Sequence, residues 1–258
     1  TELSGMVRKK VIAVTGTNGK TTTNHIIAHV LEESGQRLVC NRLGANLLDG
    51  VITAFVLAAG ADGKLDGDYA CIEVDELASV EVFPKLKPDC VVLTNVFRDQ
   101  LDRMGEVDLI CNKIQKAIKS VPDARVVVNC DDICSYGLAL GCGQQTVTFG
   151  IGERIAEDMP AGMGESMFCP VCGRRLTYDF VHYGQLGIYR CPGCGLARPC
   201  PDVAVTDVGY RDGAYAFTLD GVKVESGACA PYNVYNILSA YAALKPADAP
   251  RDRFAQAI

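Results

Sequence analysis

The chain has 258 residues, of which 48% are hydrophobic and 7% aromatic, and it contains no tryptophan. Its 25 Lys and Arg residues and 31 Asp and Glu residues give a net charge of −6, which argues against general nucleic-acid or membrane-surface binding. The longest apolar stretch, residues 51–59, is too short to cross a membrane, and no signal peptide is visible. The 13 cysteines therefore indicate free thiols, with or without a metal site, in a reducing, cytoplasmic compartment.

Apolar strands alternate with helical patterns as far as Phe149. We predict strands at residues 11–15, 69–74, 90–94, 125–129 and 146–149. We predict helices at residues 20–34, 47–59, 106–119 and 132–140. This alternation predicts an α/β fold in which helices flank both faces of a mostly parallel sheet. Residues 1–10 are polar and are expected to form an arm or a linker.

The pattern changes after Phe149. Residues 150–168 are rich in Gly, Met and acids and are expected to form a loop. Short alternating strands are predicted at 203–225, where two Asp-Gly pairs are typical of hairpin turns. A helix is predicted at 232–244, and the prolines that follow it favour a linker at 246–258.

A glycine-rich turn joins the first predicted strand to the first helix, in the segment 15–22 (TGTNGKTT). Such a turn points backbone N–H groups inward at a helix N-terminus, and both features favour a bound phosphate. Lys20 can reach the terminal phosphates, and the Thr21 hydroxyl can ligate Mg²⁺. The general P-loop has four residues between its glycines, whereas Gly16 and Gly19 enclose only two. We predict a nucleoside triphosphate site, and the weaker interpretation is an ordinary strand-to-helix turn.

Polar side chains follow the next two buried strands. Glu73, Asp75 and Glu76 come at the end of the strand at 69–74. Ligands of open α/β sheets bind beyond the carboxyl ends of the strands, where a carboxylate can hold Mg²⁺. The segment 94–103 (TNVFRDQLDR) follows the next strand in the same way. The alternatives are a solvated acidic turn and a capped loop-to-helix connection.

Two cysteine knuckles occur at 169–173 (CPVCG) and 191–195 (CPGCG), and residues 173–190 separate Cys172 from Cys191. This spacing matches a Cys₄ zinc ribbon, which leaves no ligand position for water and is therefore structural. The glycine after each knuckle permits a positive φ. The insert could cover the nucleotide site, support a partner interface or staple a long loop, and the staple is the leading interpretation. Cys200 is interpreted as a spare thiol, and the other cysteines as small core residues.

The motifs resemble those of the Mur ligases and folylpolyglutamate synthases, in family order along nearly the whole chain. Segment 15–22 is similar to their ATP loop. The stretches 94–103, 129–132 (NCDD) and 233–236 (NVYN) resemble three further signatures. Residues 44–46 (GAN), 73–76 (EVDE), 95–100 (NVFRDQ) and the cysteine insert resemble the MurT subfamily, which lacks the usual N-terminal nucleotide-sugar domain.

The resemblance implies a reaction in which ATP phosphorylates a carboxylate and an amine attacks the acyl phosphate. In the MurT subfamily, ammonia from a glutaminase partner of the GatD type converts the D-glutamate of lipid II to D-isoglutamine. The resemblance thus implies a heterodimer that meets lipid II at the inner face of the membrane, with ATP, Mg²⁺ and structural Zn²⁺ as cofactors.

The resemblance also implies residue roles. The implied nucleotide-binding residues are Gly16, Thr17, Asn18, Gly19, Lys20, Thr21, Thr22, Asn46, Asn95 and Asn236, the last at adenine. Lys20 and Glu73 are the implied catalytic residues, and Thr21 and Glu73 the magnesium ligands. The predicted zinc ligands are Cys169, Cys172, Cys191 and Cys194.

Other positions depart from the family pattern or stay open. Gln100 stands where many Mur ligases have His, which makes a second Mg²⁺ doubtful. Lys113 lies near the position of a carbamylated lysine, and an ordinary exposed lysine is an equal alternative. His25 and His29 are interpreted as helix-surface or packing residues.

We expect a Mur-type ATP-binding domain at 1–245, interrupted by a zinc ribbon at 165–200. Residues 246–258 would link it to a C-terminal ligase domain absent from this chain. An amino-acid-adding Mur or folate ligase is the first alternative, against which the ribbon and the missing N-terminal domain count. The second alternative is a zinc-ribbon protein that binds a partner or nucleic acid and uses its nucleotide site only as a switch. The net negative charge of the chain argues against this alternative.

Overall fold

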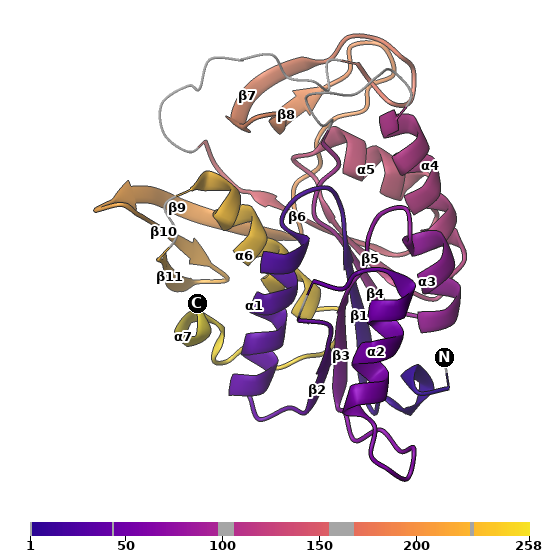
Figure 1. The fold of residues 1–258 in the computed structure, drawn as a ribbon. Coiled ribbons are helices and arrows are strands. Elements are labelled where there is room, and N and C mark those ends of the chain that lie inside the picture. Colours follow the sequence, from indigo (N-terminus) through magenta and orange to yellow (C-terminus); the bar gives the residue numbers. More distant parts are fainter. Residues whose placement is uncertain (1, 43, 98–105, 155–167, 228–229) are drawn as a thin grey trace.

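The computed structural model describes residues 2–42, 44–97, 106–154, 168–227 and 230–258. Within this described part, nine strands form one sheet (Figure 1). Their spatial order is β11 (Val222–Ser226), β10 (Ala214–Leu219), β9 (Val203–Arg211), β6 (Thr146–Ile151), β5 (Arg125–Asn129), β4 (Cys90–Leu93), β1 (Lys10–Thr15), β3 (Tyr69–Glu73) and β2 (Leu38–Cys40). Neighbouring strands from β9 to β2 are parallel, and β10 and β11 extend the sheet in antiparallel fashion.

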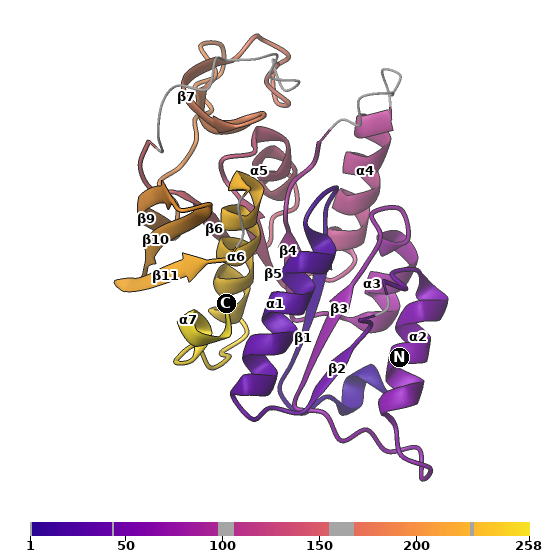
Figure 2. The same ribbon diagram turned by 60° about the vertical axis from the view of Figure 1, so that its left-hand side comes forward.

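Helices cover both faces of the sheet (Figures 1 and 2). One face carries α1 (Lys20–Glu33) and α6 (Pro231–Leu244), and the other carries α2 (Leu48–Ala58), α3 (Ser79–Leu86), α4 (Glu106–Lys119) and α5 (Ile133–Leu140). Ile12 and Val14 of β1 are buried in the core under α1 and α6, whereas Val11 and Ala13 are buried in the core under the other helices. This alternation with a period of two is what a strand covered on both faces requires. The predicted α/β fold is confirmed.

Two elements of this sheet layer escaped prediction. Strand β2 has only three residues, and α3 contains Pro84. The Asp75 side chain prepares the start of α3, because its carboxylate accepts hydrogen bonds from the backbone N–H groups of Leu77 and Ala78. A turn of this kind forms from local residues alone and favours the start of a helix. The proline inside α3 argues against a helix, so the sequence did not predict one here.

The N-terminal residues do not form the free arm that their polarity suggested. They contain a short 3₁₀ helix, η1 (Ser4–Met6), and then run beside the segment before β3. The backbone N–H groups of Arg8 and Lys9 donate to the carbonyls of Gly67 and Asp68 at 3.1 and 2.9 Å. Backbone pairing of this kind needs no apolar side chain, which explains why composition alone missed it.

Residues 246–258, which were expected to be a linker, fold back onto the domain. Ala247, Ala249 and Phe254 are buried in the core under α1 and α6. The short helix α7 (Phe254–Ala257) lies against α1. The apolar side chains in this segment gain burial by packing here, and that gain outweighs the turn-forming effect of the prolines.

The cysteine insert occupies the crossover from β6 to β9. Its strands β7 (Thr177–Tyr183) and β8 (Leu186–Arg190) pair as a separate antiparallel hairpin. The hairpin lies beyond the C-terminal ends of the parallel strands, on the side where β4 ends (Figures 1 and 2). Of the predicted 165–200 insert, residues 165–167 lie outside the described residues; residues 168–200 are called the cysteine ribbon below. In the described parts of the chain, no helix combines the length and the apolar character that a membrane span needs.

Candidate active site and metal centre

The turn between β1 and α1, residues 16–19, is called the nucleotide loop below. Gly16 has a φ of +122° and Gly19, the N-cap of α1, a φ of +83°. A Cβ on Gly16 would lie 2.4 Å from Thr94 Oγ1, and one on Gly19 would lie 2.1 Å from Asn236 Oδ1. Both glycines are therefore required twice, by backbone conformation and by the close approach of another element.

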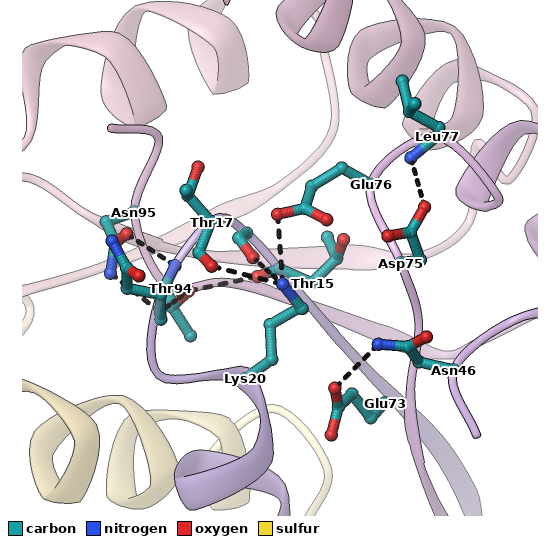
Figure 3. A network of polar contacts seen from close by, with 12 residues as sticks. Thr15, Thr17, Lys20, Asn46, Glu73, Asp75, Glu76, Leu77, Thr94 and Asn95 are labelled. Atoms are coloured by element: carbon teal, nitrogen blue, oxygen red, sulfur yellow. Dashed lines mark hydrogen bonds and ion pairs between the residues drawn. The ribbon is translucent and has the colours of Figure 1, made fainter. Parts of the chain in front are cut away.

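The residues that follow β4, Thr94 and Asn95, hydrogen-bond to the nucleotide loop (Figure 3). The Asn95 side chain accepts from Asn18 N at 3.0 Å and donates to Asn18 O at 2.9 Å. Thr94 Oγ1 donates to the same carbonyl at 2.8 Å, and Thr17 N donates to Asn95 O at 2.8 Å. Asn95 was expected to contact the nucleotide. Its side chain is instead buried and its amide hydrogen-bonds to the loop, so Asn95 stabilises the conformation of the loop.

The Lys20 ammonium lies inside a cage of oxygens (Figure 3). It donates to Gly16 O at 2.7 Å, to Thr17 O at 3.2 Å and to Glu76 Oε1 at 3.1 Å. The side chains of Lys20 and Glu76 are 14% and 13% exposed. Glu76 belongs to the acidic turn after β3 but was not among the predicted site residues, because nothing in the sequence pattern showed that this carboxylate contacts Lys20.

A second carboxylate, Glu73, lies at the end of β3 and is 3% exposed. Its Oε1 accepts from Asn46 Nδ2 at 3.0 Å, which joins two predicted site residues from different segments (Figure 3). Asn41 fixes the Glu73 backbone, because its side chain accepts from Glu73 N at 2.9 Å and donates to Glu73 O at 2.8 Å. Asn41 is a positioning residue that the sequence did not reveal.

These side chains surround a pocket of about 310 Å³. Its lining residues are Thr17, Asn18, Gly19, Lys20, Thr21, Thr22, Asn46 and Glu73. The pocket thus combines an ammonium and a helix N-terminus, which suit phosphate, with a hydroxyl and a carboxylate, which are the hard oxygen ligands that Mg²⁺ prefers. The structure brings together in one place most of the residues that the sequence assigned to nucleotide and magnesium.

A larger pocket of about 430 Å³ continues from the first, because Thr21 and Thr22 line both. Its walls include His25 and His29, both exposed on α1, and Asn233 of α6. Asn236 does not line either pocket. It is 5% exposed, packs against Gly19, and donates to Asn233 Oδ1 at 3.3 Å.

The four knuckle cysteines converge at the base of the ribbon hairpin, with all four Sγ atoms within 4.8 Å of one another. Cys169 Sγ lies 3.6 Å from Cys194 Sγ, and Cys172 Sγ lies 3.4 Å from Cys191 Sγ. A tetrahedral zinc with bonds of about 2.3 Å needs sulfurs roughly 3.8 Å apart. The donor set and its spacing therefore fit a structural zinc ion.

The local backbone of the second knuckle favours the thiolate of Cys191. Gly173 and Gly195 have φ values of +69° and +78°, in the left-handed region that each knuckle glycine was expected to permit. Hydrogen bonds from the backbone N–H groups of Cys194 and Gly193 lower the pKa of the Cys191 thiol to about 6. The thiolate is the form that binds metal, so Cys191 is the ligand best prepared for an ion at neutral pH, whereas sharing hydrogen bonds with neighbouring sulfurs raises the pKa of the Cys172 and Cys194 thiols.

The knuckles and the C-terminal end of the ribbon are each anchored to the main domain. Cys169, Cys191 and Tyr189 share a small core with Ile133 of α5. Arg198, at the end of the ribbon, pairs with the fully buried Asp131 at 2.7 Å. Cys200 is exposed and lies outside the four-cysteine group.

The remaining predictions have separate outcomes. Residues 98–103 of the predicted 94–103 segment, including Gln100, lie outside the described residues. Lys113 is exposed on α4. Cys71 and Cys90 are buried in strands, and burial raises the pKa of the Cys90 thiol to about 12. Both are small core residues, as predicted.

A family model for the Mur ligase middle domain matches residues 14–171. The chain belongs to the Mur ligase family. Among Mur ligase relatives, the MurT subunit of the glutamine-hydrolyzing lipid II isoglutaminyl synthase of Staphylococcus aureus (strain COL) is 33% identical over 235 residues, which are 91% of this chain and 52% of that protein. The MurT subunit of Streptococcus pneumoniae (strain ATCC BAA-255 / R6) is 34% identical over 234 residues, 90% of this chain and 52% of that protein.

A solved Mur-type structure, a pseudomurein peptide ligase type C from Methanothermus fervidus, is also similar. It superposes with a TM-score of 0.77 at 25% identity, over 97% of this chain and 49% of that one. The family resemblance expected from the motifs is thus confirmed, and the chain spans about half the length of the relatives it matches.

Proposed function

We propose that the protein carrying this chain is the ATP-dependent ligase subunit of an amidotransferase that converts the D-glutamate carboxylate of lipid II to D-isoglutamine. One observation carries the proposal. Lys20, Thr21 and Glu73 line a single pocket in a chain that is a third identical to two MurT subunits over nine-tenths of its length. A glutaminase partner of the GatD type would supply ammonia, and lipid II would bring the protein to the cytoplasmic face of the membrane.

The reaction joins two anions, so the site must neutralise charge. The γ-phosphoryl group of ATP passes to a carboxylate oxygen, which gives an acyl phosphate and ADP. Ammonia then attacks the carbonyl carbon, phosphate leaves, and the nitrogen loses a proton. Lys20 and the loop N–H groups would hold the phosphates, and Thr21 and Glu73 would hold Mg²⁺, which supplies Lewis-acid stabilisation when bound. Asn46 would keep the Glu73 carboxylate turned toward the pocket.

The second pocket supports a place for the nucleoside. It opens from the phosphate pocket past Thr21 and Thr22, and Asn233 offers an amide to a base or ribose. Asn236, expected at adenine, would instead fix the nucleotide loop through Gly19. The zinc ion in the ribbon and a C-terminal ligase domain beyond residue 258 belong to the same proposal.

A reconstitution tests the function. The full-length protein is incubated with its glutaminase partner, lipid II, glutamine and Mg-ATP, and the stem peptide is followed by mass spectrometry. We expect conversion of the stem acid to the amide, loss of this activity in Lys20→Ala, and full activity in Lys85→Ala, which changes an exposed lysine on α3. Addition of an amino acid without amidation would instead support the amino-acid-adding alternative.

A further inference from the structure

The hairpin of the cysteine ribbon ends at the segment that holds the nucleotide loop. Its turn, Gly184 and Gln185, reaches the residues that follow β4. A Cβ on Gly184 would lie 3.5 Å from the ring of Phe97. The ribbon therefore contacts the same short segment that carries Asn95.

Gln185 makes the connection through its side chain, in a site where it is 3% exposed. Its amide nitrogen donates to Val96 O and to Asp132 Oδ1, both at 2.9 Å. Asp132 Oδ2 accepts from Val96 N at 2.8 Å. Because a primary amide carries two N–H donors, Gln185, Val96 and Asp132 close a buried ring of hydrogen bonds.

Both neighbours of Val96 bond the nucleotide loop. The Asn95 side chain accepts from Asn18 N and donates to Asn18 O. Phe97 N donates to Thr17 Oγ1 at 3.2 Å. A shift of Val96 would therefore move both contacts. Position and stiffness of the loop depend on where Gln185 holds this segment.

The other end of the hairpin is the four-cysteine site. Strand β8 leads directly from Gln185 to Cys191, a span of about 20 Å for an extended chain. The cysteine site also packs on Ile133, the residue after Asp132. Thus the ribbon touches the Asp132 region twice, through the Gln185 side chain and through the core around the knuckles.

We propose that metal occupancy of the four-cysteine site sets the affinity of the nucleotide loop, with Gln185 as the positioning residue that transmits the effect. The inference rests on the proposed nucleotide site and deepens it. With metal bound, the two knuckles are one rigid unit, and β8 presents Gln185 in a single place. Without metal, the knuckles separate more easily, and the buried Val96 carbonyl and Asp132 Oδ1 lose the amide donor of Gln185, which disfavours the loop conformation that binds phosphate.

A linkage experiment on the full-length protein tests the coupling. The dissociation constant of Mg-ADP is measured by calorimetry for zinc-loaded and chelator-treated protein, with zinc content read by mass spectrometry and folding by circular dichroism. The variants are Gln185→Met, which keeps the side-chain volume but has no donor, and Asp179→Asn, an exposed control on the same hairpin.

We expect zinc removal to weaken Mg-ADP binding at least tenfold in the wild type and in Asp179→Asn. Zinc-loaded Gln185→Met should bind as weakly as the zinc-free wild type, and zinc removal should weaken it less than threefold further. Affinity that stays within twofold on removing zinc from folded wild type would overturn the proposal. If zinc-free protein unfolds, wild-type affinity in zinc-loaded Gln185→Met overturns it instead. A zinc-loaded wild type that binds no Mg-ADP would overturn the nucleotide site itself.

Discussion

The Nζ atom of Lys20 lies 3.1 Å from Oε1 of Glu76, and both side chains are largely withdrawn from solvent. In this ion pair the Glu76 carboxylate contacts the ammonium group that would neutralise the phosphates of a bound nucleotide. Two loop carbonyls complete the cage around the ammonium. Nucleotide phosphate must therefore compete with Glu76 for Lys20, or share it.

The first prediction follows from this competition. Glu76→Gln should bind ADP without Mg²⁺ severalfold more tightly than the wild type, because one negative charge beside the phosphates is removed. Lys20→Ala should weaken binding by about 1.5–3 kcal/mol, the range for a hydrogen bond to a charged group. Calorimetry on both variants measures the effects. Weaker ADP binding in Glu76→Gln would show that Glu76 positions Lys20 and does not compete for it.

The second prediction concerns Gly19. Alanine there must adopt a φ of +83° and place its Cβ 2.1 Å from Asn236 Oδ1. The backbone strain alone costs roughly 1–3 kcal/mol, so Gly19→Ala should lower nucleotide affinity at least tenfold. The double variant Gly19→Ala/Asn236→Ala removes the contact and should recover part of the loss. No recovery would mean that backbone strain accounts for the whole effect.

Metal dependence is expected to change at Glu73. Glu73→Gln keeps the shape of the side chain but removes the charge that would hold Mg²⁺, so ATP turnover should require much more Mg²⁺. Binding of ADP in the absence of Mg²⁺ should stay near the wild-type level. A titration of activity against Mg²⁺ concentration measures the shift. An unchanged titration would exclude Glu73 as a metal ligand.

The cysteine site should hold about one zinc ion per chain. The double variant Cys169→Ser/Cys191→Ser removes one ligand from each knuckle and should lose the metal, whereas Cys200→Ser should keep it, because Cys200 lies outside the cluster. Elemental analysis of purified protein gives the answer. Equal zinc content in the three proteins would contradict the ribbon.

Alkaline pH should destabilise the fold through its buried thiols. Burial raises the pKa of Cys90 from 9.0 to about 12, so between these values the folded chain keeps a proton that the unfolded chain has lost. Its contribution is complete below pH 9, and the free energy of unfolding then falls by up to about 1.4 kcal/mol per pH unit as the pH rises toward 12. Urea denaturation at pH 8, 9 and 10 should show a shallower decline in Cys90→Ala and an unchanged decline in Cys200→Ala.

Local chemistry explains how much of the site could be predicted. The nucleotide loop needs glycines at two backbone positions and a lysine at the helix start, and all three lie within residues 16–20 of the sequence. The cysteine knuckles are equally local. In contrast, the Lys20–Glu76 and Asn46–Glu73 contacts depend on how parallel strands bring separate loops to one edge. Only the packing of the whole sheet determines such contacts. The sequence therefore identified these residues as candidates but did not predict which of them contact one another.

The same distinction holds for the fold. Apolar runs predicted the strands buried on both faces, such as β1 and β4, because residues 11–14 and 90–93 are all apolar. The pattern missed α3, whose internal Pro84 argues locally against a helix. It also missed the docking of Phe254, because a short segment that mixes charged and apolar residues shows no period.

The return of the last residues to α1 determines where this domain can be cut. Phe254 stacks edge-on against Tyr241 at 4.9 Å, and Ala257 and Ile258 form part of the wall of the second pocket. A boundary at Lys245, just after the last long helix, would uncover the Tyr241 ring and open the pocket on the side that faces His25 and His29. For protein engineering, a boundary placed after α6 should therefore keep residues 246–258 with the domain.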